Sequence, residues 1–233
     1  EWSYYNHTKE PTNLHLVNVI GFLDVAVDPT DPEHAVAATW TGGVVEFEEG
    51  TLVTIYDESN SALQIYGTET GRVAIAGLNI DSDGNVWVAK SNCIEPIVVK
   101  EPGGTWHSFG ASSFVSNEIV SKVLITQNDH VWVMKPFLGA LGGGIQTFNY
   151  NGTLSDESDD EYVFLNGNEG TGNLPSTSVY AMAEDHDGEI WVGTGEGVAV
   201  FYSPDNVFSG GNYDAQQVLI EQDGNLQLLL ETE

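Results

Sequence analysis

Apolar residues occur along this chain in short runs that are separated by turn residues. The stretch "DHDGEIWVGTGEGVAVF" (185–201) shows the pattern. Asp187-Gly188 supplies the positive-φ positions of a tight hairpin between an apolar run before it and the Ile-Trp-Val run after it. That second run is apolar on both faces, which is typical of a strand packed between neighbouring sheets. The pattern therefore predicts consecutive short strands at 178–184, 189–194 and 198–202.

The same turn-and-tryptophan pattern recurs. "NIDSDGNVWVAKS" (79–91), "ITQNDHVWVMKP" (125–136) and "AEDHDGEIWVGTG" (183–195) align without gaps. Their shared column holds Trp87, Trp132 and Trp191. A degenerate copy at 24–47 has Val36 in this column. We predict that the tryptophans are buried between sheets, that Gly84 and Gly188 form the turns, and that Gly193 allows a close approach.

A second, aromatic strand pattern lies between these copies, at 1–6, 51–63, 104–110 and 161–176. The tryptophans are 45 and 59 residues apart, a period of about 50 that matches a four-stranded propeller blade. The sequence therefore predicts an all-β fold, a partial β-propeller. Its expected parts are blades at about 17–57, 72–110, 117–166 and 177–231, preceded by one extra outer strand at 1–6. We expect the hairpin around Gln222-Asp223-Gly224 to join the third and fourth strands of the last blade.

The charge balance excludes one class of partner. Six Lys and Arg stand against 35 Asp and Glu, for a net charge of −29. Such an acidic chain repels nucleic acid and anionic lipid, and the acid content favours solubility, in a salty or calcium-containing environment. No apolar run is long enough to span a membrane. Residues 1–5 lack the features of a secretory signal, so we expect a cytosolic protein, a mature exported one or a piece of a longer chain.

Two acidic motifs are candidates for calcium. The Asp-x-Asp-Gly turns lack the spacing and closing glutamate of an EF-hand, so they favour hairpin geometry. The acidic insertion "SDESDDEY" (155–162) is the better candidate, although a solvated charged loop is the alternative. Its candidate ligands are Asp156, Glu157, Asp159 and Asp160. We predict no other cofactor.

The residues give little support to catalysis. Arg72 is the single arginine, so the arginine cluster of a sialidase is absent. The six histidines form no close pair, and His130 and His186 lie in turns where we expect exposure. Cys93, the single cysteine, is expected to be a small core filler. Carboxylate pairs for glycoside hydrolysis stay open with 35 acids, but none has an apolar context, so we predict a non-enzymatic protein.

The stretch 179–201 resembles the two-component regulator propeller repeat, which is common in exported proteins of the Bacteroidota. The stretches "WSYYN", "DVAVDPTDPEHAVAATWTGGVVEF", "GTWHSFG" and "AQQVLIEQDGNLQLLLETE" are similar, in this order, to a propeller of PorZ-type proteins of the type IX secretion system. The chain departs from the pattern at Val36 and in the long insertion at 151–174.

The PorZ-type resemblance implies a scaffold and interaction module at the cell surface. Proteins of that type act in an attachment complex on the outer membrane, with a sortase that exchanges the C-terminal signal of cargo for anionic lipopolysaccharide, which they are thought to bind. No binding residue is carried over by the resemblance. The alternative is the periplasmic, oligosaccharide-sensing propeller of a hybrid two-component regulator.

Overall fold

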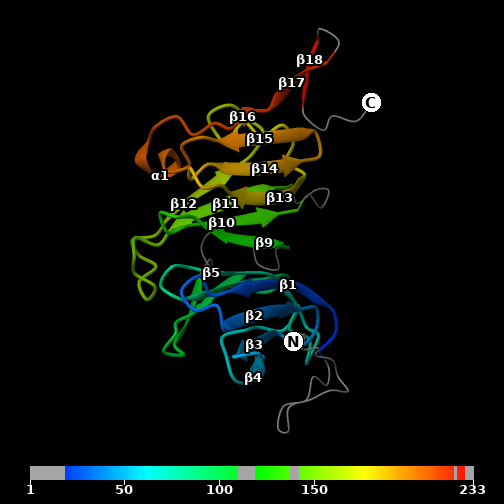
Figure 1. Ribbon diagram of the computed structural model, residues 1–233, viewed down its shortest axis with the longest axis vertical. Helices are drawn as coiled ribbons and strands as arrows, with labels where there is room; N and C mark the ends of the chain where they lie inside the picture. The colour runs from blue at the N-terminus through cyan, green and yellow to red at the C-terminus, as the bar shows by residue number, and fades with distance from the viewer. Residues whose placement is uncertain (1–18, 110–118, 137–141, 223–224, 229–233) are drawn as a thin grey trace. The chain divides into compact units, whose positions relative to one another are not determined.

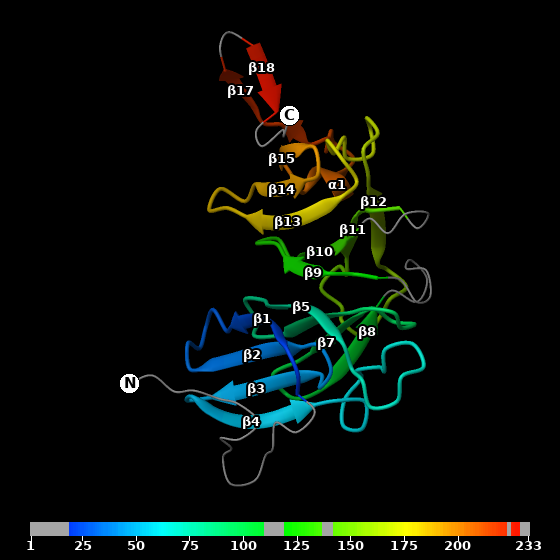
Figure 2. The same cartoon turned by 90° about the vertical axis from the view of Figure 1, so that its right-hand side faces the viewer.

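The computed structural model describes residues 19–109, 119–136, 142–222 and 225–228 of the chain (Figure 1). In these ranges the protein is all-β, with four four-stranded antiparallel sheets, one two-stranded sheet and a single helical turn, α1 (Asn206–Ser209). Each four-stranded sheet is a meander in which strands pair in chain order, as Figure 2 shows most clearly for β1 to β4. The predicted fold class, a partial propeller, is confirmed. The predicted strand at 1–6 lies outside the described residues.

The four sheets have these strands. The first contains β1 (Phe22–Val27), β2 (His34–Thr39), β3 (Val44–Glu48) and β4 (Thr51–Tyr56). The second contains β5 (Ile75–Ile80), β6 (Val86–Lys90), β7 (Ile97–Lys100) and β8 (Trp106–Phe109). The third contains β9 (Lys122–Ile125), β10 (His130–Lys135), β11 (Gly144–Asn149) and β12 (Glu161–Leu165). The fourth contains β13 (Val179–Glu184), β14 (Ile190–Thr194), β15 (Gly197–Phe201) and β16 (Gln216–Gln217).

The chain forms two compact units, residues 1–123 and 124–233. In the first unit β1 and β2 pack against β5, and the core is aliphatic, with Val36, Ile75, Leu78, Val88 and Val98 buried. In the second unit β10 packs against β13, and the core contains larger side chains, including Trp132, Met134, Ile145, Met182 and Phe201. Both cores exist because the inward faces of the strands carry nearly continuous apolar runs.

The Asp-x-Asp-Gly turns are hairpins closed by their first aspartate. Asp81 Oδ1 accepts the N–H groups of Asp83 and Asn85 at 3.0 and 2.9 Å, and its Oδ2 accepts the indole N–H of Trp87 at 2.7 Å. Gly84 has φ +80°, a left-handed conformation that suits glycine. The carboxylate is therefore used by its own hairpin.

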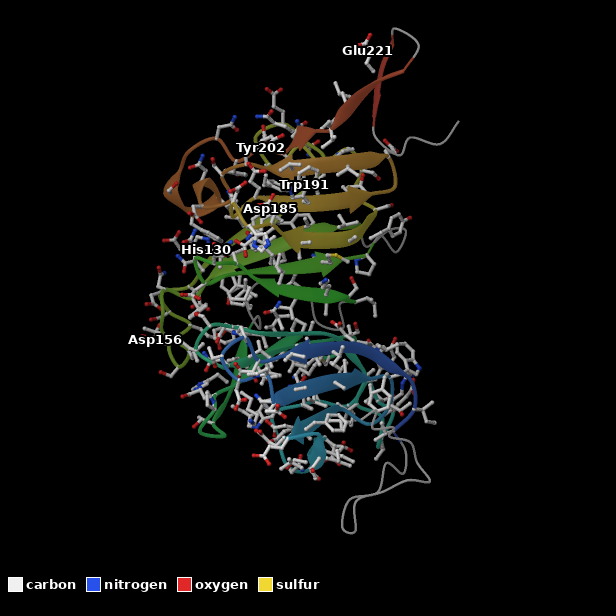
Figure 3. All side chains as sticks on the ribbon, in the orientation of Figure 1. His130, Asp156, Asp185, Trp191, Tyr202 and Glu221 are labelled. Carbon is white, nitrogen blue, oxygen red and sulfur yellow. The ribbon has the colours of Figure 1, made fainter. Side chains whose placement is uncertain are left out.

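The fourth sheet repeats this arrangement between β13 and β14. Asp185 Oδ2 accepts the indole N–H of Trp191 at 2.7 Å (Figure 3 labels both residues). Gly188 again has φ +80°. Gly193, by contrast, lies inside β14, where an added Cβ would meet only the Ala181 side chain at an ordinary 3.5 Å. The expected close approach at Gly193 is therefore wrong for the described structure.

The third copy departs from the other two. Thr126 replaces the turn aspartate, and Asp129 adopts φ +60° in the column that holds Gly84 and Gly188. Without a carboxylate at position 126, the indole N–H of Trp132 is buried with no hydrogen-bond acceptor among the described residues. An aspartate is among the few non-glycine residues that tolerate this backbone region.

The repeated tryptophans differ in burial. Trp87 and Trp132 are fully buried, and Trp132 packs edge-to-face on Phe201 of the following sheet, with ring centroids 5.1 Å apart. Trp191 is 38% exposed, so its predicted burial is wrong. The physical reason is the neighbour: β15 covers Trp132, whereas within the described residues no four-stranded sheet follows to cover Trp191.

The C-terminal hairpin is not part of the fourth sheet. β16 is the fourth strand of that sheet, and β17 (Leu219–Gln222) and β18 (Asn225–Leu228) form a separate two-stranded sheet. Our expectation that this hairpin joins the third and fourth strands of the last blade is therefore wrong. The sequence does contain the signal: "LIEQDGNLQ" (219–227) aligns with "NIDSDGNVW" (79–87), with Glu221 in the column of Asp81.

Candidate functional site

Three loops meet at one end of the first unit. They are the β2–β3 turn (40–43), the long β4–β5 loop (57–74) and the β6–β7 loop (91–96). In a meander these connections share one end of the sheets. Hydrogen bonds join them: Gly43 N–H donates to Val73 O at 3.0 Å, and Gly67 N–H donates to Asn92 O at 2.7 Å. Backbone hydrogen bonds thus hold the three loops in one structure, which we call the loop end of the first unit.

The loop end contains a cavity of about 550 Å³, within the usual range of ligand pockets. Its lining residues are Glu58, Leu63, Gln64, Ile65, Gly67, Cys93 and Ile94. Gln64 joins the two walls, because its Nε2 donates to Glu95 Oε2 at 3.0 Å and its Oε1 accepts the N–H groups of Ile94 and Glu95 at 3.1 and 3.3 Å. The amide of Gln64 is therefore committed to the loops, and the wall is mainly apolar.

Two side chains with nucleophilic groups, the amine of Lys90 and the thiol of Cys93, support the loops around this cavity from inside the protein. Lys90 is fully buried and its Nζ donates to Ala62 O at 3.1 Å, and burial lowers the pKa of Lys90 to about 8. The Cys93 thiol is buried and donates to Glu95 O at 3.4 Å, and burial raises its pKa. Cys93 is a small buried side chain, as predicted. Both groups bond to loop carbonyls, which indicates a supporting role.

The single arginine forms a stack at the same end of the unit. The Arg72 guanidinium carbon lies 4.5 Å from the Trp40 ring centroid and 4.2 Å from that of Tyr66. Its Nη1 donates to Glu69 Oε2 at 2.9 Å. Trp40 is 47% exposed, so this cation–π stack leaves an aromatic surface open to solvent. The sequence pattern does not indicate the stack, because Trp40 lies on the β2–β3 turn whereas Tyr66 and Arg72 lie on the β4–β5 loop.

A second polar cluster joins the two sheets of the first unit. The Glu46 carboxylate accepts hydrogen bonds from Lys100 Nζ at 3.0 Å and from the Tyr56 hydroxyl at 2.6 Å. The His34 ring lies between two carboxylates, with Nε2 3.0 Å from Glu46 Oε1 and Nδ1 3.2 Å from Asp28 Oδ2. Asp28, His34, Glu46 and Lys100 are all buried, and we call these residues with Tyr56 the buried ionic cluster.

The buried ionic cluster is expected to make the stability of the first unit depend on pH. Burial lowers the pKa of His34, but hydrogen bonds to Asp28 and Glu46 outweigh it and raise the pKa above 6.5. The stabilisation by His34 is therefore complete below pH 6.5 and is lost as pH rises through the raised pKa. Burial opposes ionisation of Glu46 as well, but hydrogen bonds from Tyr56 and Lys100 lower its pKa below 4.5. Its stabilisation is complete above that value and is lost as pH falls.

Thermal melting of the wild type and of His34→Gln from about pH 5 to pH 9 measures this. We expect the wild type to be the more stable protein at the acidic end and the difference in melting temperature to shrink as pH rises. A difference that stays constant over this range would contradict a charged imidazole.

The four predicted calcium ligands do not form a preformed site. They are Asp156, Glu157, Asp159 and Asp160, on the β11–β12 loop (Figure 3 labels Asp156). Three of the carboxylates accept hydrogen bonds from the loop or its flank: Asp156 from Ser158 N–H, Asp159 from the Thr153 hydroxyl, and Asp160 from the Tyr162 hydroxyl at 2.8 Å. Across the described ranges no three His, Cys, Asp or Glu side chains gather where they could hold a metal ion.

The two turn histidines differ from each other. His186 is exposed, whereas the side chain of His130 is only 12% exposed and its ring packs edge-to-face on Phe208 at 4.7 Å. Burial lowers the pKa of His130. The expected exposure of His130 is therefore wrong, because α1 folds back over the turn of the preceding sheet.

These sheets and turns define the chain as a β-propeller domain. Residues 173–196, which span the β13–β14 hairpin, match the family model described as "Two component regulator propeller". None of the curated proteins matches the chain. The resemblance that the repeats indicate is thus confirmed for this hairpin.

Comparison with solved structures is more specific. The chain is similar to PorZ, an essential bacterial surface component of the type IX secretion system of Porphyromonas gingivalis, with 26% identity and a TM-score of 0.80. The match covers 94% of this chain and 31% of the PorZ chain, so the chain spans about a third of that protein. The chain is therefore a propeller domain similar to part of PorZ.

Two further structures share the fold alone. The extracellular domain of a hybrid two-component system from B. thetaiotaomicron is 20% identical, with a TM-score of 0.53 over 80% of this chain and 22% of its own. An ancestral GH74 enzyme is 15% identical, with a TM-score of 0.51 over 92% of this chain and 26% of its own.

The one helix in the described ranges, α1, is a single short turn, and no helix there is long and apolar enough to cross a membrane.

Proposed function

We propose that this chain is a non-enzymatic interaction module of a PorZ-like surface component in a type IX secretion attachment complex. The observation that carries the proposal is the similarity to PorZ over 94% of the chain, at 26% identity and a TM-score of 0.80. This agreement extends well beyond the single hairpin that matches the repeat model. The proposed location is the cell surface or outer membrane.

The chemistry of the loop end supports binding without catalysis. Lys90 and Cys93, the nucleophile types nearest the cavity, are buried and bonded to loop carbonyls. The Arg72 guanidinium is stacked between two rings and paired with Glu69. A catalytic group has to reach its substrate, and these groups are engaged in holding loops in place.

The proposed partners are protein components of the complex, namely the sortase and outer-membrane proteins, together with anionic lipopolysaccharide. The net charge of −29 opposes contact with an anionic polymer. We therefore place the protein partners first and lipopolysaccharide second.

The test is deletion of the segment that encodes this propeller from its gene, with attachment of C-terminal-signal cargo at the cell surface as the readout. We expect cargo to lose its surface attachment and the intact gene to restore it. In-cell cross-linking then identifies the proteins that contact the propeller. Normal cargo attachment in the deletion strain would refute the proposal.

The alternative is a periplasmic ligand-sensing propeller of a hybrid two-component regulator that recognises oligosaccharides. It is supported by the match of residues 173–196 to the regulator propeller model. We rank this alternative second, because the hybrid-system domain has a lower identity and a lower TM-score to this chain than PorZ has. Loss of an oligosaccharide-dependent transcriptional response, with cargo attachment intact, would favour this alternative.

A further inference from the structure

The cavity at the loop end offers few free polar groups to a ligand. The Gln64 amide uses one N–H and its oxygen on the β6–β7 loop, and Cys93 is bonded to the Glu95 carbonyl. The remaining walls include Leu63, Ile65 and Ile94. A sugar buried there would leave hydroxyl groups without partners, at a cost of about 1–3 kcal/mol for each group. An apolar group would lose nothing, so the lining favours an apolar ligand.

The rim of the cavity adds negative charge. Glu58 lines the cavity and is exposed. The whole chain carries −29, so its field attracts cations and repels anions. The side chain of Ile94 is 62% exposed at the mouth of the cavity. An apolar floor with an acidic rim complements an apolar group flanked by positive charges.

We infer that this cavity binds a peptide segment of a protein partner that inserts an apolar side chain between lysines or arginines. The volume of about 550 Å³ suits one or two side chains with part of their backbone. Ile94 and Leu63 contact the inserted side chain, and Glu58 faces a flanking cation. This inference rests on the proposed function, because it assigns the partner-binding surface of the same interaction module.

A set of three short peptides tests the inference on the full chain. The probes are Ac-Lys-Gly-Phe-Gly-Lys-amide, the same peptide with Glu in place of Lys, and the same peptide with Gly in place of Phe. Binding is followed through the backbone amide resonances of Gly67 and Ile94. We expect the first peptide to shift both resonances saturably, and both other peptides to bind roughly tenfold more weakly at low salt. High salt is expected to weaken the binding of the first peptide.

A matched pair of variants locates the site. Ile94 and Ile20 are both exposed isoleucines of the first unit, at 62% and 64%, but only Ile94 lines the cavity. Ile94→Asp is expected to lower the affinity for the lysine–phenylalanine peptide roughly tenfold, and Ile20→Asp is expected to leave this affinity unchanged. Glu58→Gln is expected to lower the affinity for the same peptide about threefold at low salt and to change it little at high salt. Melting curves of all three variants verify that each is folded.

Several results would overturn the inference. They are equal binding of the three peptides, resonance shifts that avoid Gly67 and Ile94, and wild-type affinity in folded Ile94→Asp. Specific binding of a neutral oligosaccharide at this cavity in place of the peptide would overturn it as well. The deletion experiment is independent of these outcomes. If cargo attachment depends on the propeller while no peptide binds, the proposed function stands and this inference fails.

Discussion

Trp132→Ala is expected to lower the free energy of unfolding of the second unit by about 3–5 kcal/mol, the range for removing a large buried aromatic side chain. The indole is fully buried and packs against Phe201 with centroids 5.1 Å apart. Its N–H has no acceptor among the described residues, so the loss comes from packing. Amide hydrogen exchange of β10 and β15, measured at increasing denaturant concentration, reports the change in the free energy of unfolding of this unit.

Trp191→Ala is the matched control, because Trp191 occupies the same column of the repeat but is 38% exposed. It gives up less packing, although it also gives up the hydrogen bond to Asp185. We expect about half the effect of Trp132→Ala, or less. Equal losses from the two substitutions would show that burial between sheets is not what makes Trp132 important.

Glu46→Gln is expected to destabilise the first unit by about 3–5 kcal/mol, the usual result of removing one partner from a buried ion pair. The substitution keeps the size of the side chain and removes its charge. Lys100 is then left buried without its carboxylate, and the imidazolium of His34 keeps only Asp28. The measurement is the unfolding free energy at about pH 6, which lies below the raised pKa of His34 and above the lowered pKa of Glu46.

Glu48→Gln serves as its control. Glu48 lies on the same strand, β3, two residues further on, and its side chain is exposed. Glu48 has only a minor charge interaction with His34, so this exposed substitution is expected to change stability by about 0.5 kcal/mol or less. If Glu46→Gln were equally mild, the buried ionic cluster would contribute little beyond what an uncharged amide provides.

The strands and their sheets could be predicted from the sequence because their determinants are local. Each hairpin is specified by an Asp-Gly or similar turn next to an apolar run, and such neighbours in sequence are neighbours in space. The pairing of β13 with β14 follows from Asp187-Gly188 alone. Even the change of Gly to Asp129 in the third copy leaves the turn recognisable.

Burial and the candidate site depend on residues far apart in the chain, so the sequence pattern did not reveal them. The burial of a repeat tryptophan depends on whether another sheet packs over it, and the Asp-x-Asp-Gly turn that Trp191 shares with Trp87 does not encode that. The cavity needs Gln64 to meet Glu95, 31 residues away, and the buried ionic cluster needs Glu46 to meet Lys100, 54 residues away. A periodic pattern carries no signal for such pairs.

The C-terminal hairpin shows a different kind of failure. Its turn lies only 36 residues after Gly188, and spacing alone therefore favoured the last strands of the fourth blade. The residue pattern of 219–227 instead matches the start of a repeat, and β16 fills the fourth position with only two residues. Blade length varies because outer strands vary, whereas the turn motif is kept.

The burial of Lys90 and Lys100 changes the charge of the surface that the protein exposes to solvent. Lys90 is fully buried and Lys100 is only 8% exposed, so the outer surface is more uniformly negative than the composition indicates. A surface of this kind gathers a dense atmosphere of counterions, and two copies that approach each other have to compress these atmospheres. We therefore expect copies of the domain to stay apart at high local density. Docking of a partner of opposite charge releases counterions into bulk water, and the entropy of the released ions favours binding.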